Sequence, residues 1–131
     1  MMLAAAGPDR VSLDQAAGVY GISKNHLMKV AQRLAKEGLI VASRGRGGGF
    51  LLAKEPREIR LGDVVRGAEK NLALVECFSP NSNCCPITTS CKLQKILANA
   101  LEAFLDELNK FTLRDLIEDN RALRAQLGLK E

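Results

Sequence analysis

Two consecutive helix-start patterns, separated by a short glycine-containing turn, constrain the fold of this chain most strongly. Ser12 is followed by Gln15 at the third helical position, which is typical of a capping box and predicts a helix over residues 13–20. Gly21-Ile22-Ser23 separates it from a second helix, which Ser23 caps and which ends at Gly38. Two helices joined by so short a turn predict a helix-turn-helix, whose second helix enters the major groove of DNA.

The second helix is predicted to have one apolar and one polar face. Its apolar residues recur at three- and four-residue spacing, which indicates one buried face. They are Leu27, Val30, Ala31 and Leu34. The polar face is basic, and its N-terminal part is expected to reach base edges and phosphates. The candidate DNA-binding residues are Ser23, Lys24, Asn25, His26, Lys29 and Arg33. An ordinary helical hairpin with a solvated polar face is the alternative.

A β-hairpin, or wing, is predicted directly after these helices. Residues 39–43 are typical of a strand, residues 44–49 form a basic glycine-rich stretch, and residues 50–52 are typical of a return strand. Arg44 and Arg46 lie at the tip, where glycines let the backbone approach a phosphate and where a narrow minor groove favours arginine. A nucleotide-binding loop is the weaker alternative, because no Lys-Ser/Thr pair and no helix follow the glycines.

Charge and composition favour double-stranded DNA as the partner. Residues 1–60 hold ten Lys and Arg against five acidic residues, whereas residues 61–131 hold nine against ten. Tryptophan is absent and aromatic residues make up 4% of the chain, so the stacking platforms of single-strand binders are not expected. No run approaches the roughly 18 apolar residues of a membrane span, and the first residues lack a secretory pattern. We therefore expect a cytoplasmic protein.

Four cysteines lie between positions 77 and 91, in a stretch rich in Ser, Asn, Pro and Thr that predicts a loop. In a reducing compartment they favour a metal site or reactive thiols over a structural disulfide. Seven residues separate Cys77 from Cys85 and five separate Cys85 from Cys91, which is wider than the gaps of most structural zinc sites. Soft thiolates on so long a loop favour an iron–sulfur cluster, with one of the neighbours Cys84 and Cys85 left spare. Structural zinc, a thiol switch and unligated thiols are the alternatives.

The rest of the chain predicts further helices. Residues 1–6 are typical of the end of a helix, and residues 61–70 of a short one. Residues 91–110 predict a long helix whose apolar stripe exceeds what so small a domain can cover, so we expect a partner helix in a homodimer. Thr112 with Asp115 predicts another capping box, and the charged residues from Glu118 onward are expected to fray. The predicted segments are a winged helix-turn-helix domain (1–60), a connector helix (61–76), a cysteine loop (77–91), a dimerisation helix with the following short helix (92–117) and a polar tail (118–131).

The segments 20–30, 44–49 and 74–78, three cysteines ahead of the long helix, and residues 111–116 after it form one combined pattern. In this combination the chain resembles the NsrR/IscR family of iron–sulfur winged-helix transcription regulators over nearly its whole length. Within that family it is most similar to the nitric-oxide-sensitive NsrR branch. IscR-like members carry a histidine ligand three residues after the last cysteine, and Gln94 occupies that position here.

The resemblance implies a mainly α fold and a repressor that binds double-stranded operator DNA as a homodimer. It implies that nitric oxide is sensed through an iron–sulfur cluster, of the 2Fe-2S or 4Fe-4S type. It also implies Cys77, Cys85 and Cys91 as cluster ligands and Cys84 as a spare or alternative ligand, because Cys85 keeps the family's gap to Cys91. Family members begin with a further segment that forms most of the first helix, so we expect residues 1–6 to be only the end of that helix.

Two other function classes fit parts of the pattern. A small iron–sulfur electron-transfer protein would use the basic half of the chain to dock an acidic protein partner. A winged-helix regulator with structural zinc or a thiol switch would keep the DNA-binding segment but not the cluster. An enzyme is not expected, because the single histidine, His26, lies on the presumed DNA face and no acid–base pair or nucleophile arrangement is visible.

Overall fold

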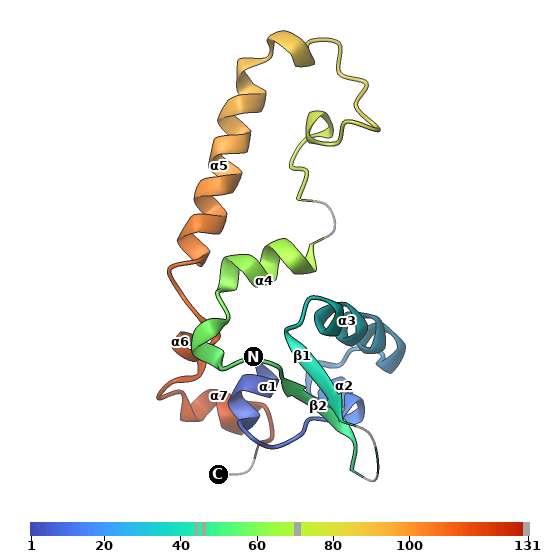
Figure 1. Cartoon of the computed structure of the whole chain (residues 1–131), viewed down its shortest axis with the longest axis vertical. Coiled ribbons are helices and arrows are strands. Elements are labelled where there is room, and N and C mark those ends of the chain that lie inside the picture. The colour runs from blue at the N-terminus through green and yellow to red at the C-terminus, as the bar shows by residue number, and fades with distance from the viewer. Residues whose placement is uncertain (44, 46, 70–71, 130–131) are drawn as a thin grey trace. The chain divides into compact units, whose positions relative to one another are not determined.

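The computed structural model describes residues 1–43, 45, 47–69 and 72–129, which form a mainly α-helical fold with one two-stranded antiparallel sheet (Figure 1). They group into two compact units. Unit 1 consists of residues 1–60 and 111–131, and unit 2 of residues 61–110. Among the described residues, no helix combines the length and the apolar character needed to cross a lipid bilayer.

Unit 1 contains the predicted helix-turn-helix, formed by α2 (Leu13–Tyr20) and α3 (Lys24–Lys36). The Ser12 hydroxyl accepts a hydrogen bond from the Gln15 amide at 3.1 Å, and the Gln15 side chain accepts one from the Ser12 amide at 2.8 Å. The predicted capping box is therefore confirmed. Gly21 ends α2 in the left-handed conformation. Ala31 of α3 is buried, but Val30 is 39% exposed, so its predicted place on the buried face is wrong.

The wing is confirmed as a hairpin of β1 (Ile40–Ser43) and β2 (Gly49–Leu52), in which Ile40 pairs with Leu52 and Ser43 with Gly49. β2 also pairs on its other edge with Val11, whose amide donates to the Phe50 carbonyl at 3.1 Å and whose carbonyl accepts from the Phe50 amide at 2.9 Å. This extra pairing fixes the hairpin to the segment that leads into α2.

The C-terminal segment belongs to unit 1 and is folded. It contains α6 (Leu113–Ile117), after the predicted capping box of Thr112 and Asp115, and α7 (Arg121–Gln126). α7 packs beside α1 (Met2–Ala6) (Figure 1). The Arg124 guanidinium donates to the Ala5 carbonyl. The expected fraying after Glu118 is wrong, because apolar residues of this segment pack against α1 and complete its core. The buried members of that core are Met2, Ala5, Ala6, Val11 and Leu127.

α6 contacts the short 3-10 helix η1 (Pro56–Glu58), which follows the wing in unit 1. The Leu113 amide donates to the Ile59 carbonyl at 3.0 Å, and Arg60 forms an isolated antiparallel bridge with Thr112. Unit 2 is inserted between Arg60 and Phe111, so the chain leaves and re-enters unit 1 at adjacent positions.

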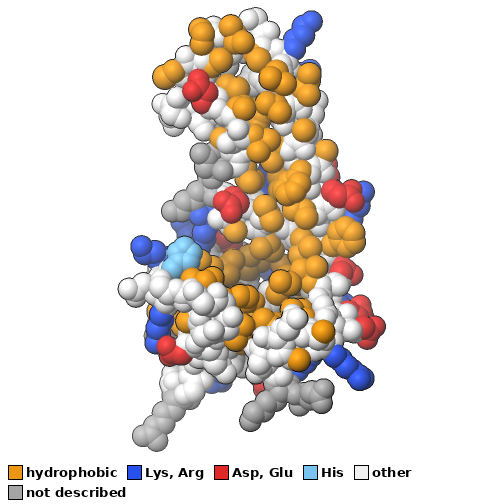
Figure 2. Space-filling view, turned by 180° about the vertical axis from the view of Figure 1, so that it is seen from behind, with side chains coloured by type: hydrophobic (Ala, Val, Ile, Leu, Met, Phe, Trp, Pro, Cys, Tyr) orange, Lys and Arg blue, Asp and Glu red, His pale blue; other side chains and the backbone are white. Residues whose placement is uncertain are grey.

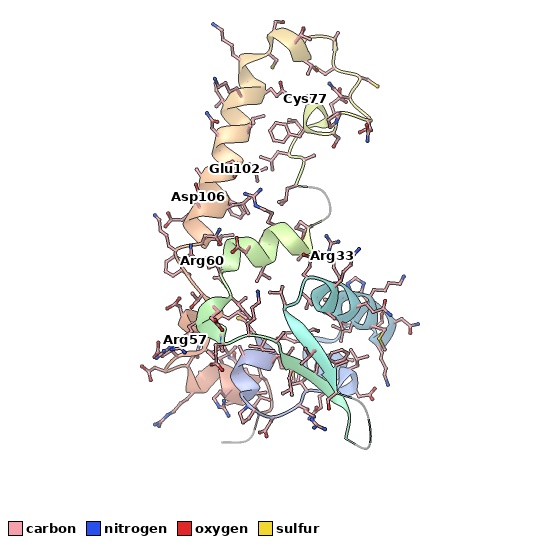
Figure 3. The ribbon with its side chains drawn as sticks, viewed as in Figure 1. Arg33, Arg57, Arg60, Cys77, Glu102 and Asp106 are labelled. Carbon is pink, nitrogen blue, oxygen red and sulfur yellow. The ribbon has the colours of Figure 1, made fainter. Side chains whose placement is uncertain are left out.

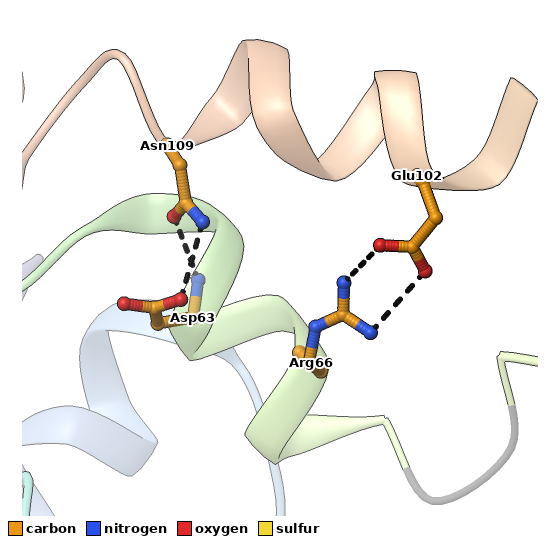
Figure 4. Close-up of polar contacts among 4 residues, drawn as sticks. All are labelled: Asp63, Arg66, Glu102 and Asn109. Atoms are coloured by element: carbon orange, nitrogen blue, oxygen red, sulfur yellow. Dashed lines mark hydrogen bonds and ion pairs between the residues drawn. The ribbon is translucent and has the colours of Figure 1, made fainter. Parts of the chain in front are cut away.

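Unit 2 is built on α4 (Leu61–Ala68) and the predicted long helix, α5 (Lys92–Leu108). Two polar contacts join these helices (Figure 4). The Asn109 side chain accepts from the Asp63 amide at 3.0 Å and donates to the Asp63 carboxylate at 3.1 Å. The Arg66 guanidinium pairs with the Glu102 carboxylate at 2.8 Å, and this hydrogen-bonded partner raises the pKa of Arg66.

The apolar stripe of α5 has two sides in unit 2. Leu105 is 1% exposed, and Leu97 and Leu101 are half-buried on the side that faces α4 and the cysteine loop. On the other side Leu93, Ile96 and Phe104 are 54–62% exposed. In the space-filling view of Figure 2, hydrophobic side chains gather along unit 2. The predicted single stripe is therefore half covered by the chain's own elements and half uncovered.

Candidate nucleic-acid interface and cysteine loop

The N-terminal turn of α3 presents most of the predicted DNA-binding residues to solvent. The Ser23 hydroxyl caps the helix by accepting from the His26 amide at 3.2 Å. Lys24, Asn25, His26 and Lys29 are exposed, whereas Arg33 is half-buried one turn further along. In Figure 2 the single histidine lies at the surface. Polar side chains at the free N-terminal turn of a capped helix can approach the edges of bases in a major groove.

One of these residues already has a protein partner. The Lys24 ammonium lies 2.7 and 2.9 Å from the two carboxylate oxygens of Asp14, which belongs to the first turn of α2. Both side chains are largely exposed, at 56% and 75%. Sequence reasoning missed Asp14, although it is the only acidic residue between positions 11 and 36.

The wing tip has the backbone geometry that its glycines predict. Gly45 and Gly47 have φ values of 106° and 75°, which strain any residue with a side chain. The Gly48 amide donates to the Gly45 carbonyl at 2.9 Å and closes a tight turn. The predicted minor-groove residues Arg44 and Arg46 lie outside the described residues.

The cysteine loop holds one exposed and three half-buried thiols, all of them free. Cys84 is exposed, and Cys77, Cys85 and Cys91 are half-buried. The backbone around Cys85 is fixed by its own loop: its amide donates to the Asn83 side chain at 3.0 Å, and its carbonyl accepts from the Thr88 hydroxyl at 2.9 Å. The Asn83 amide group donates in turn to that hydroxyl at 2.9 Å. Of the two neighbouring cysteines, Cys85 is the less exposed, while the exposed Cys84 thiol donates to the Ser82 carbonyl at 3.9 Å.

Cys77 and Cys91 both lie near the start of α5. Cys91 is the N-cap residue, and the Gln94 side chain in the first turn donates to the Cys77 carbonyl at 3.0 Å. This bond holds the turn η2 (Glu76–Phe78) beside α5, where Figure 3 labels Cys77. A groove next to it is lined by Leu72, Phe78, Ala98 and Leu101 among others. Sequence reasoning identified Gln94 only as a residue that replaces histidine, and an amide at that position gave no hint of this contact.

The donor set of the loop fits a soft metal centre. Three half-buried thiols, two of them near a helix N-terminus, are ligands that iron–sulfur clusters use, and the free amides of the first turn favour negative charge there. Within the described residues, however, no three His, Cys, Asp or Glu side chains are grouped closely enough to hold a metal ion.

Comparisons with known proteins agree with this arrangement. Residues 1–119 match the family model Rrf2, described as iron-dependent transcriptional regulator. The chain is 45% identical over 132 residues to the HTH-type transcriptional regulator NsrR of Bacillus subtilis, covering 100% of this chain and 90% of that protein. It is 47% identical over 119 residues to NsrR of Shouchella clausii, covering 91% of this chain and 80% of that protein.

Solved structures give the same result. T. potens IscR superposes with a TM-score of 0.69 at 27% identity, covering 94% of this chain and 82% of that one. CymR of B. subtilis, named a global cysteine regulator, superposes with a TM-score of 0.67 at 26% identity, covering 88% and 84%. The helix-turn-helix with its wing, and the long helix that follows, are therefore shared with known winged-helix regulators.

Proposed function

Because the chain belongs to the Rrf2 family of iron-dependent transcriptional regulators, we propose that it is a repressor that senses nitric oxide through an iron–sulfur cluster. Its relatives are named HTH-type transcriptional regulators, so the chain is a regulator of transcription and not an enzyme. The nitric oxide part of the proposal rests on the similarity to NsrR. It also rests on Gln94, which stands where IscR-like proteins carry a histidine ligand and so separates this chain from the IscR branch. Operator binding requires access to the chromosome, so we propose that the protein acts in the cytoplasm.

The exposed, capped N-terminal turn of α3 carries the DNA-binding part of the proposal. It places Lys24, Asn25 and His26 where a helix-turn-helix contacts base edges, with Lys29 one turn further along. The wing follows at once, with Arg44 and Arg46 in its tip as proposed minor-groove contacts. Basic residues neutralise phosphates, so we expect operator affinity to fall steeply with salt.

The uncovered side of α5 supports a homodimer. Leu93, Ile96 and Phe104 leave a continuous apolar face on a long helix, which a second copy of the same helix would cover. A symmetric dimer places its two recognition helices, the α3 helix of each protomer, on two half-sites, so the proposed operator is palindromic. We call α3 the reading helix below.

The cysteine loop supports the sensor part of the proposal. Cys77, Cys85 and Cys91 would hold the cluster, with Cys84 as the spare thiol, because Cys84 is exposed and Cys85 is fixed by Asn83 and Thr88. When bound, the cluster would supply iron that reacts with nitric oxide. The chain's own part is to keep two of the three thiols beside the first turn of α5, through the Gln94 side chain and the N-cap position of Cys91.

A pair of matched variants tests the ligand assignment. Protein purified without oxygen is assayed for iron, acid-labile sulfide and visible absorption. We expect Cys85→Ala to lose all three, and Cys84→Ala to keep them. The reverse pattern would overturn the choice of Cys85, and zinc in place of iron and sulfide in the unmodified protein would replace the cluster with a structural zinc site.

A further inference from the structure

A single carboxylate stands beside the reading end of α3. Between positions 11 and 36 the chain carries four basic residues and one acidic residue, Asp14. The tight turn at Gly21 brings the first turn of α2 next to the first turn of α3, and there both Asp14 oxygens contact the Lys24 ammonium, at 2.7 and 2.9 Å. Asp14 therefore pairs with the basic residue nearest the N-terminus of the reading helix.

This pair is poorly suited to stabilise the fold. The two side chains are 56% and 75% exposed, and ion pairs in such positions contribute little to folding because solvent and salt screen them. The start of α2 is already closed by the reciprocal bonds of Ser12 and Gln15. The Asp14–Lys24 ion pair is therefore expected to contribute little to the stability of the fold.

The contact changes what Lys24 can do on DNA. An unpaired lysine is a flexible point charge that moves to the nearest phosphate and adds affinity for any sequence. Here the Lys24 ammonium donates to one Asp14 carboxylate oxygen at 2.9 Å and lies 2.7 Å from the other, and the carboxylate repels phosphates that approach the same point. The remaining ammonium hydrogens of Lys24 are available at a position from which a recognition helix contacts base edges.

We propose that Asp14 is a positioning residue that determines specificity: it withholds Lys24 from the DNA backbone, so that Lys24 reads a base edge. The inference rests on the proposed role of α3 as the reading helix. Removing the carboxylate converts Lys24 into an additional phosphate contact. Affinity for unrelated duplexes then rises, while affinity for the operator does not rise with it.

The test uses the full chain and two fluorescent duplexes of equal length. One is an operator selected from random sequences by the unmodified protein, and the other is a scrambled version of it. For Asp14→Asn we expect about threefold tighter binding to the scrambled duplex at moderate salt, and a salt slope steeper by about 0.9, the value for one added phosphate contact. Operator affinity stays within about twofold, so the specificity ratio falls.

Two controls separate this role from a change of net charge or of folding. Asp119→Asn changes the charge equally, and asparagine tolerates the positive φ of 53° at that position between α6 and α7. It should leave the salt slope unchanged. In a Lys24→Gln background, Asp14→Asn should have no further effect on the slope, because the lysine that it releases is gone. Thermal unfolding reports any loss of structure.

The outcomes distinguish this inference from the proposed function. If Lys24→Gln weakens operator binding while Asp14→Asn changes neither the slope nor the scrambled-duplex affinity, Asp14 has no positioning role and the reading helix stands. A parallel loss of both affinities with a lower unfolding temperature makes Asp14 structural. If the unmodified protein binds no duplex of any sequence, the proposed function itself fails.

Discussion

Asp63 and Asn109 form two hydrogen bonds that fix the start of α4 against the end of α5 (Figure 4). The Asp63 backbone amide donates to the Asn109 side chain at 3.0 Å, and the Asn109 side chain donates to the Asp63 carboxylate at 3.1 Å. The neighbouring Gly62 makes this approach possible. A Cβ atom at Gly62 would lie 2.4 Å from the Leu105 carbonyl oxygen and 2.6 Å from the Asn109 side-chain oxygen. Leu105 is the most deeply buried side chain described, so the helix crossing is also the centre of unit 2.

Gly62→Ala is expected to destabilise unit 2. The added methyl group meets a backbone carbonyl that cannot move aside, and overpacking of this kind costs about 1–3 kcal/mol. Denaturant unfolding measures the loss. Gly18→Ala is the matched control, because Gly18 lies inside α2 with no atom within 4 Å of the added carbon, and it should stabilise by about 0.5–1 kcal/mol. Equal effects of the two substitutions would contradict the close crossing.

Ile96→Glu is expected to separate the dimer. Ile96 is 62% exposed on the uncovered side of α5, and losing its burial in an interface removes about 2 kcal/mol per protomer, before the cost of burying a charge. If the proposed dimer forms, sedimentation velocity should show monomer for this variant at concentrations where the unmodified protein sediments as a dimer. Asn99→Glu adds the same charge at an exposed polar position of α5 and should leave the dimer intact. An unchanged dimer in Ile96→Glu would place the interface elsewhere.

Leu127→Ala is expected to destabilise unit 1 by about 2–5 kcal/mol, the usual cost of truncating a buried leucine. Leu127 is 5% exposed and packs with Met2, Ala5, Ala6 and Val11, so the loss opens a cavity beneath α1. Thermal unfolding measures it, with Leu74→Ala as the control because Leu74 is largely exposed. If both variants unfold alike, the C-terminal segment does not complete the core.

Asp115 is expected to give α6 a pH-dependent stability. The amide and the hydroxyl of Thr112 donate to its carboxylate and lower the pKa of Asp115 below its usual value. A group whose folded pKa is depressed stabilises the fold above its unfolded pKa, and this stabilisation is lost as the pH falls through the folded pKa. The unfolding temperature of Asp115→Asn should therefore lie below that of the unmodified protein at neutral pH, and the difference should shrink in acid. A difference independent of pH would contradict the role of the charge.

Local patterns in the sequence predicted most of the fold. The capping boxes at Ser12 and Thr112 and the glycine turn at Gly21 identified the helix starts and the turn, because these interactions span only three or four residues. The packing of the C-terminal segment was not predicted because its partner, α1, lies more than a hundred positions away in the sequence, as the Arg124 to Ala5 contact shows. Charge-rich composition hid the apolar spacing of Leu123, Leu127 and Leu129.

The sequence was enough to name candidate functional residues, but not to predict which residues contact them. Lys24 and Cys77 were identified as functional, yet their partners Asp14 and Gln94 depend on how separate helices and turns come together. Gly62 could have been noticed as an isolated glycine in a helical pattern, which often marks close packing. The choice of Cys85 over Cys84 as a ligand followed from the family resemblance and stays a prediction; Cys84 is exposed and Cys85 is half-buried.

In the proposed function, loss of an iron–sulfur cluster held by this loop releases the operator. The most direct measurement is a nitric oxide titration of anaerobically purified protein bound to fluorescent operator, following visible absorption and anisotropy in the same sample. We expect iron and sulfide in the starting material, and a fall in anisotropy in step with the loss of absorption. Metal-free protein that holds the operator at full strength, or absorption that bleaches while anisotropy stays constant, would contradict it.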